Sequence, residues 1–285
     1  MTAAPKPLEL RSDSLRLSLR ADIGGSIAGL WRDEVPVLRS ADPLTLAAPR
    51  GAASFPLMPY SNRLAYRRFK WLGQSHTTEP NFDDSPHSLH GVAWRRPWTV
   101  GPHTEQDAVL SLSHRADADW PFDFEARQTF TLTPNALELR LEFTNTAATA
   151  APSGLGWHPY FPKRLRSRLH VELTDRWEAD ATRLPTRKVP QPGIDADVAH
   201  LEFDHCFEGW RGAAVIRDEK LTLKLTSSLP YLIVYTPTDK DYFAIEPVSH
   251  VSNAINMSDP GAYGLRTLQP GETTSAWMRL EIAGV

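Results

Sequence analysis

The sequence has little cysteine and no excess of positive charge. Its 285 residues include one cysteine, Cys206, so no disulfide can form within the chain. The net charge is -3, which argues against nucleic acid as a partner because nucleic-acid-binding surfaces are usually basic. No stretch approaches the roughly 18 apolar residues of a membrane span, and residues 1–20 lack the apolar core of a signal peptide. We therefore expect a cytoplasmic protein that binds neither nucleic acid nor membrane.

The sequence also lacks the motifs of several large enzyme classes. It contains no phosphate-binding Walker loop and no dinucleotide-binding glycine fingerprint. The Gly-x-Ser-x-Gly elbow of α/β-hydrolases is missing too, so a Ser-His-Asp hydrolase is only weakly supported. No window of helical length carries a convincing apolar stripe, which argues against a helical fold.

Proline and alternating apolar residues are abundant instead. The 24 prolines fit loops and short strands better than long helices. Apolar residues recur at every second position, as in half-buried antiparallel strands. This alternation is found in residues 15–19, 129–132, 137–143, 221–225 and 277–282. We predict an all-β fold, a large antiparallel β-sandwich formed as one domain over residues 1–285. The proline-rich segment Arg183–Val198 is expected to be a long loop.

Glu246 stands out because of its apolar setting. It lies in the segment Tyr242–Pro247, shortly after the apolar run Tyr231–Tyr235, and a proline follows it directly. A carboxylate so close to an apolar strand is costly to bury, and carboxyl groups with shifted pKa values gather at functional sites. Glu246 is therefore a candidate functional residue, with a structural glutamate at a strand end as the alternative.

Two polar clusters in the first third of the chain interrupt the strand pattern. In Pro56–Leu64, two prolines stiffen the approach to Asn62 and Arg63, and the Arg63 guanidinium offers a planar set of donors for oxygen atoms. The segment His87–Trp94 contains His-x-x-His, which could ligate a metal, although no helix or cysteine pair supports that alternative. Gly91 after His90 indicates a close backbone approach or an unusual dihedral angle.

Two further clusters lie in the second half. In Gly154–Pro162, His158 sits between aromatic residues and prolines, and histidine is the side chain best suited to exchange protons near neutral pH. In Leu201–Phe207, Asp204 has aromatic neighbours on both sides. Each residue also has a structural alternative: a satisfied structural histidine for His158 and a turn aspartate for Asp204.

At these clusters the sequence resembles the aldose 1-epimerase (mutarotase) family, which has the galactose-mutarotase-like fold. The resemblance covers most of the chain, and the matching motifs occur in the family's order. They are Pro59-Tyr60-Ser61-Asn62-Arg63, His90-Gly91, His158-Pro159-Tyr160-Phe161, Asp204-His205-Cys206-Phe207, and Glu246-Pro247 followed by Asn253-Ala254. The resemblance implies a β-supersandwich with a sugar-binding cleft on a concave sheet. It also implies an enzyme that interconverts α and β anomers without a metal or other cofactor. The sequence leaves open whether the protein is a monomer or a homodimer.

The resemblance also implies roles for individual residues. It makes Glu246 the general base and His158 the general acid, and it makes Arg63, His90 and Asp204 sugar-binding residues with Asn62 beside them. The sequence departs from the family at two places. Pro162 follows Phe161 where asparagine is common, and the segment Pro247–Ser252 lacks the further proline often found before the asparagine, here Asn253. Both departures concern the substrate more than the chemistry.

Two alternatives remain open. A hexose-phosphate mutarotase would need cations for the phosphate, and the clusters Arg67-Arg68 and Arg95-Arg96 could supply them. A non-catalytic carbohydrate-binding β-sandwich would use the same cleft for binding alone, although the presence of both Glu246 and His158 argues against it.

Overall fold

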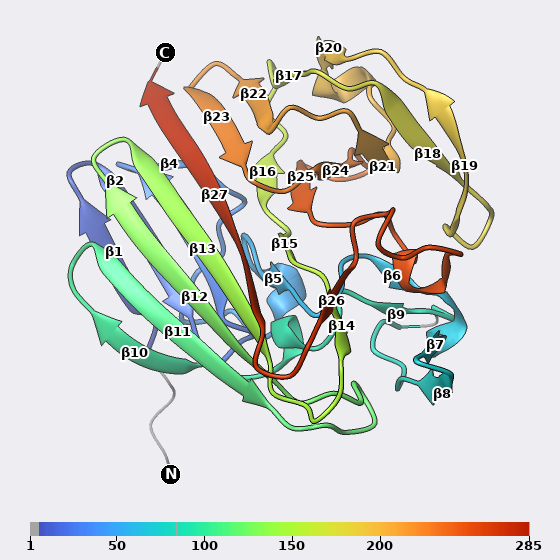
Figure 1. Cartoon of the computed structure of the whole chain (residues 1–285). Helices are drawn as coiled ribbons and strands as arrows, with labels where there is room; N and C mark the ends of the chain where they lie inside the picture. Colours follow the sequence, from blue (N-terminus) through green and yellow to red (C-terminus); the bar gives the residue numbers. More distant parts are fainter. Residues whose placement is uncertain (1–5, 84, 285) are drawn as a thin grey trace.

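The computed structural model describes residues 6–83 and 85–284, which fold almost entirely into antiparallel strands (Figure 1). Helical structure within these residues consists of short 3-10 turns: η1 (Pro49–Gly51), η2 (Ala65–Arg67), η3 (Ala93–Arg95), η4 (Val198–His200) and η5 (Ala254–Asn256). None of the helices in this part of the chain is long and apolar enough to cross a membrane. The all-β expectation is confirmed.

The largest sheet in the described residues has nine strands and extends from the left side to the top of Figure 1. Its order is β10 (Thr99–His103), β11 (Asp107–His114), β12 (Phe124–Thr133), β13 (Ala136–Asn145), β27 (Thr273–Gly284), β23 (Leu221–Ser227), β22 (Ala213–Arg217), β17 (Arg168–Val171) and β20 (Ile194–Asp197). The predicted alternation is visible in β13, where Leu137, Leu139, Leu141 and Phe143 are buried and the residues between them are more exposed. The C-terminal strand β27 pairs with β13 and β23 in the middle of this sheet.

A second sheet of eight strands carries the candidate site. Its order is β19 (Pro185–Pro190), β18 (Asp175–Ala179), β21 (Asp204–Glu208), β24 (Tyr231–Tyr235), β25 (Tyr242–Val248), β15 (Gly156–Trp157) and β5 (Pro56–Leu57), and β16 (Tyr160–Pro162) also pairs with β25. Successive side chains in a strand point to opposite faces. In β25, Phe243 and Ile245 therefore enter the hydrophobic core, while Ala244 and Glu246 lie on the other face.

Smaller sheets complete the fold. They are the N-terminal sheet β1 (Leu8–Ser12), β2 (Leu15–Arg20), β3 (Ser26–Arg32) and β4 (Val35–Pro36), and the pairs β6 (Arg63–Leu64) with β9 (Ser88–Leu89), β7 (Arg68–Trp71) with β8 (Gln74–Thr77), and β14 (Ala151–Ser153) with β26 (Arg266–Leu268). The main core cluster joins the N-terminal and the two large sheets, for example through Leu17, Leu141 and Ile245. This packing of sheet on sheet confirms the β-sandwich prediction.

The expectation of a long loop over Arg183–Val198 is wrong, because this segment contains β19 and β20. Both are edge strands: β19 ends the eight-stranded sheet and β20 ends the nine-stranded sheet. Proline is tolerated at an edge because its missing N–H can face away from the ladder. No residue of β19 is fully buried and most are exposed, so the segment lacks the apolar alternation that identifies a half-buried strand.

Gly91 makes the close backbone approach that the sequence indicated. Its φ is +68°, and a Cβ atom at this position would lie 2.0 Å from the Met58 carbonyl oxygen. The neighbouring Val92 N–H donates to that same oxygen at 2.9 Å. The contact fixes the segment that follows His90 against the strand region before Asn62.

We predict that Gly91→Ala destabilises the protein much more than Gly73→Ala. Both glycines have positive φ, which costs an alanine about 1–2 kcal/mol, but a Cβ at Gly73 would have no neighbour within 4 Å. Overlap with the Met58 carbonyl should add about 2 kcal/mol or more for Gly91→Ala. Urea unfolding of both variants measures the difference, and equal losses of stability would contradict the close contact.

Candidate active site

All six residues singled out in the sequence line one cavity of about 350 Å³. They are Asn62, Arg63, His90, His158, Asp204 and Glu246. The cavity lies on the face of the eight-stranded sheet opposite the core, and the segments around β6 and β9 supply Asn62, Arg63 and His90. Residues far apart in the sequence are therefore gathered at one place.

Strand register explains why the sheet residues face the same way. Residues paired across antiparallel strands point to the same face. Asp204 of β21 pairs with Tyr235 of β24, which pairs with Ala244 of β25, which pairs with Tyr160 of β16. Glu246, two residues beyond Ala244, shares that face.

Glu246 and His158 are in direct contact at the bottom of the cavity. The Glu246 Oε1 atom lies 3.1 Å from His158 Nε2, and the two residues are 2% and 6% exposed. The other polar atoms of the pair, Glu246 Oε2 and His158 Nδ1, are buried and have no hydrogen-bond partner among the described residues. A buried carboxyl oxygen without a partner is costly, so the arrangement suits a ligand better than a purely structural ion pair.

The surroundings shift both ionisation equilibria toward the uncharged forms. Burial, followed by the negative charge of Asp204, raises the pKa of Glu246 well above its ordinary value. Burial, followed by His90 and the Arg39 charge, lowers the pKa of His158 well below its ordinary value. Both shifts favour the form of the pair in which the carboxyl group of Glu246, rather than the imidazole of His158, carries the proton.

Aromatic rings surround the His158 imidazole. Its ring centroid lies 4.3 Å from that of Tyr160 and 4.8 Å from that of Phe55, and the Tyr160 hydroxyl is 3.4 Å from Nε2. The Arg39 guanidinium packs on the Tyr160 ring at 3.9 Å. Sequence reasoning assigned no role to Tyr160, Phe55 or Arg39. Only the spacing of Tyr160, two residues after His158 and therefore on the same face, could have identified one of them.

Arg63 and Asp204 form the second polar group of the cavity. Arg63 Nη2 lies 4.0 Å from Asp204 Oδ2, and Arg183 Nη1 lies 3.6 Å from the same oxygen. Arg63 Nη1 also donates to Asn62 Oδ1 at 3.1 Å. These contacts are long enough for a ligand hydroxyl to compete for Asp204. Arg183 was missed because it lies in the segment expected to be a loop.

The two histidines of the His-x-x-His motif bind backbone groups. His90 Nδ1 accepts the Asn62 N–H at 3.1 Å. His87 Nδ1 accepts the Tyr66 N–H at 2.9 Å, and its Nε2 lies 3.1 Å from the Thr182 carbonyl oxygen. Both His87 nitrogens are thus occupied, which argues against the metal-ligand alternative. The neutral His90 ring carries its proton on Nε2, where it can donate to a ligand.

The arginine clusters proposed for phosphate are not among the residues that line the cavity. Arg96 instead donates to Asp117 at 2.6 Å and to Asp119 at 2.5 Å. Apart from Arg63, the cationic side chains on the cavity wall are Arg50, which is paired with Asp83, and Lys240, which is paired with Asp239.

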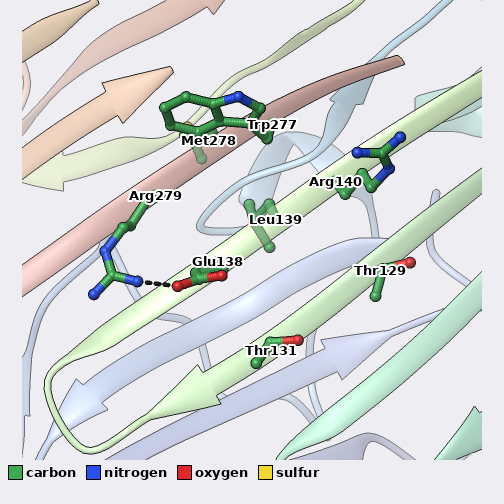
Figure 2. A pocket seen from close by; sticks show the side chains of 8 residues that line it. All are labelled: Thr129, Thr131, Glu138, Leu139, Arg140, Trp277, Met278 and Arg279. Atoms are coloured by element: carbon green, nitrogen blue, oxygen red, sulfur yellow. Dashed lines mark hydrogen bonds and ion pairs between the residues drawn. The ribbon is translucent and has the colours of Figure 1, made fainter. Parts of the chain in front are cut away.

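A depression of similar volume lies on the outer face of the nine-stranded sheet, but it lacks an acid–base pair. Figure 2 shows its lining: Thr129, Thr131, Glu138, Leu139, Arg140, Trp277, Met278 and Arg279. The Glu138 carboxylate is paired with Arg279, and the lining includes no histidine. The cavity that contains Glu246 is the candidate active site because it holds a buried carboxyl–imidazole pair.

A β-sandwich with a buried carboxyl–imidazole pair in a polar cavity has the features of an enzyme that moves protons on a small polar molecule. Comparison with known proteins agrees: the family model for aldose 1-epimerase matches residues 8–281. The chain belongs to the aldose 1-epimerase family.

Individual relatives span nearly the whole chain. The uncharacterised protein YphB of Escherichia coli K12 is 31% identical over 96% of this chain and 97% of its own length. A solved structure from Escherichia coli K12 is 28% identical, has a TM-score of 0.87 and covers 98% of this chain and 99% of its own. A galactose mutarotase-like protein from Clostridium acetobutylicum also has a TM-score of 0.87, at 20% identity, with 98% and 95% covered; at that identity the likeness shows the fold.

We predict that the free energy of unfolding falls as the pH drops from 6.5 toward 4. Burial lowers the pKa of His90 to about 3 and that of His250 to about 4, whereas histidines in the unfolded chain titrate near about 6.5. The unfolded chain then binds more protons, so stability rises with pH in this window. The lowered pKa of His158 acts in the same direction and the raised pKa of Glu246 in the opposite one.

His90 and His250 together should contribute about 2 kcal/mol per pH unit to the slope between about pH 5 and 6, and the lowered pKa values of His76, His87 and His205 act in the same direction. Urea unfolding at several pH values measures the slope. His250→Gln, which cannot titrate, should reduce it by about 1 kcal/mol per pH unit. A slope that does not change in this variant would show that His250 titrates normally in the folded protein.

Proposed function

We propose that the protein is a single-domain aldose 1-epimerase that interconverts the α and β anomers of a neutral aldohexose. The 3.1 Å contact between Glu246 Oε1 and His158 Nε2 in an open cavity carries this proposal. In a cyclic hemiacetal, the anomeric hydroxyl oxygen and the ring oxygen are bonded to the same carbon. A base and an acid that lie side by side can therefore reach both oxygens at once.

In this mechanism, Glu246 takes the proton of the anomeric hydroxyl while His158 gives a proton to the ring oxygen. The bond between the anomeric carbon and the ring oxygen breaks, and the anomeric carbon becomes an open-chain aldehyde. Rotation of the aldehyde followed by closure on its other face gives the second anomer, with the proton transfers reversed. Each positioned proton transfer typically contributes about 10²–10⁴-fold to the rate.

The shared proton of the pair fits this cycle. The reactive form needs an ionised Glu246 and a protonated His158, whereas burial favours the uncharged form of each group. The two forms differ only in which atom carries the proton. Sugar binding can therefore produce the reactive form by moving the proton from Oε1 to Nε2, without proton exchange with solvent.

The remaining polar residues would hold the sugar. Arg63 and Asp204 offer donors and an acceptor for ring hydroxyls, and His90 offers its Nε2–H. Aromatic side chains of the cavity wall, such as Phe82 and Trp94, can pack on the apolar face of a pyranose. Holding the ring in this way keeps the anomeric carbon beside the acid–base pair, which is the role of positioning in catalysis.

We predict that Glu246→Gln lowers the rate constant of anomer exchange by at least about 10²-fold and largely keeps sugar binding, because the amide cannot accept the proton. His158→Asn should lose a similar factor, and the double variant should be little worse than either single one, because residues acting as a unit give non-additive losses. Polarimetry with freshly dissolved α-glucose or α-galactose measures the rates.

The control for these variants is Glu138→Gln, the same chemical change in the outer depression of Figure 2, which should leave the rate unchanged. Near-normal turnover in Glu246→Gln would remove Glu246 as the base. Fully multiplicative losses in the double variant would contradict a concerted pair. Sugar binding without any exchange in the wild-type protein would favour the non-catalytic alternative.

We predict that neutral aldohexoses are preferred over a hexose phosphate. Asp204 in the cavity would repel a phosphate, and Arg50 and Lys240 on the wall are each already paired with an aspartate. NMR exchange spectra of glucose, galactose and glucose 6-phosphate give the three specificity constants. A constant for the phosphate at least about tenfold above both neutral sugars, a gap of about 1.4 kcal/mol, would contradict this choice. Loss of that preference in Lys240→Ala or Arg50→Ala would then locate the phosphate.

A further inference from the structure

The segment Ser61–Tyr66, here called the Arg63 loop, supplies Asn62 and Arg63 to the cavity but has an unfavourable backbone. The φ of Asn62 is +57° and that of Tyr66 is +49°, both in the left-handed region that non-glycine residues rarely adopt. Only Arg63–Leu64 within this segment forms a strand, β6, and that strand pairs over two residues. Something other than a regular sheet must therefore hold the loop in this conformation.

Buried side chains accept backbone N–H groups near both ends of the loop. His250 Nε2 accepts the Ser61 N–H at 3.1 Å, and His87 Nδ1 accepts the Tyr66 N–H at 2.9 Å. His250 is 2% exposed and His87 is fully buried. Neither is among the residues that line the cavity. Both therefore act on the loop from behind.

Each of these histidines is fixed in one neutral tautomer. A ring nitrogen that accepts an N–H carries no proton, so the proton must be on the other nitrogen. In His250 that nitrogen is Nδ1, which donates to the Val251 carbonyl oxygen at 2.8 Å. In His87 it is Nε2, which donates to the Thr182 carbonyl oxygen at 3.1 Å. The two residues thus use opposite nitrogens for the same task.

His87 also connects the two arginines that meet at Asp204. Its Nε2–H holds Thr182, next to Arg183, while its Nδ1 holds the loop that carries Arg63. The two guanidinium groups lie 3.6 and 4.0 Å from the same Asp204 oxygen. A change at His87 should therefore disturb both partners of Asp204.

We propose that His87 and His250 are positioning residues of the active site, which hold Arg63 and Asn62 in the cavity by accepting the Tyr66 and Ser61 N–H groups. Only the kinetic test of this inference rests on the proposed function. The residues touch neither acid nor base, so their loss should weaken sugar binding and leave the proton transfers intact.

His87 accepts through Nδ1 and His250 through Nε2, so the same two substitutions should have opposite effects at the two positions. The side-chain oxygen of asparagine can take the place of the histidine Nδ1 atom, and that of glutamine can take the place of Nε2. His87→Asn and His250→Gln therefore keep an acceptor for the loop, whereas His87→Gln and His250→Asn lose it. Each position thus provides its own matched control.

We expect the KM for glucose to rise about tenfold in His87→Gln and His250→Asn, because the Tyr66 or Ser61 N–H loses the acceptor that holds the loop. It should stay within about threefold of the wild-type value in the matched variants, and kcat should change by less than about threefold in all four. Equal effects of the two substitutions at a position, or effects confined to kcat, would overturn the inference.

Amide hydrogen exchange without sugar tests the same contacts independently of activity. Peptides covering residues 59–68 should exchange faster in the two variants that lose the acceptor and at the wild-type rate in the two that keep it. If the wild-type protein interconverts no sugar, the proposed function fails, and the exchange pattern still decides this inference. Equal exchange in all four variants would overturn it.

A measurement on the wild-type protein tests the inference even where a variant does not fold. Long-range ¹⁵N NMR spectra of labelled histidine identify which ring nitrogen carries the proton. His250 should show the Nδ1–H tautomer and His87 the Nε2–H tautomer near neutral pH. Either residue in the other tautomer, or protonated on both nitrogens, could not accept the loop N–H, and the inference would be wrong.

Discussion

Contact between a buried carboxyl group and a buried imidazole is the constraint around which this site is arranged. Taking Glu246 and His158 out of water is costly unless each keeps a partner. Glu246 Oε1 lies 3.1 Å from His158 Nε2, and the other polar atom of each has no hydrogen-bond partner among the described residues. The packing of β25 keeps the pair in contact. Phe243 and Ile245 fix β25 in the core, which presents Glu246 on the opposite face.

The cavity residues are held by two different physical means. Strand pairing sets the positions of Asp204, Glu246 and Tyr160, so their relative placement follows from the backbone ladder. Asn62 and Arg63 lie mostly outside the ladder, in a segment whose N–H groups are accepted by buried side chains. A sheet fixes the spacing of Asp204, Glu246 and Tyr160, whereas Arg63 reaches the cavity from a strand of only two residues.

Much of the fold and the choice of site residues could be predicted from the sequence. Alternation identified β2, β13, β23 and β27, because apolar side chains at every second position of each strand enter the core. It could not identify β19, an exposed edge strand bounded by prolines. The six candidate residues were found through motifs, and they line one cavity. Their catalytic and binding roles remain predictions.

What the sequence could not provide were contacts between distant segments. The packing of Arg39 on Tyr160 joins residues more than a hundred positions apart, and no local pattern signals it. The same holds for His87. A His-x-x-His spacing is compatible with a metal site, and only the backbone groups of Tyr66 and Thr182 beside its nitrogens reveal its actual partners.

The side chains that support the Arg63 loop also determine when, during synthesis of the chain, this loop can take its final position. The acceptor for Ser61 lies 189 residues further along the chain, and the acceptor for Ala65, Asn253, lies 188 residues further. During synthesis, the loop emerges from the ribosome long before either partner exists. The cavity wall that carries Asn62 and Arg63 can therefore be fixed only after Asn253 has been made. A nascent chain that stops before this point can form strands but cannot have a finished active site.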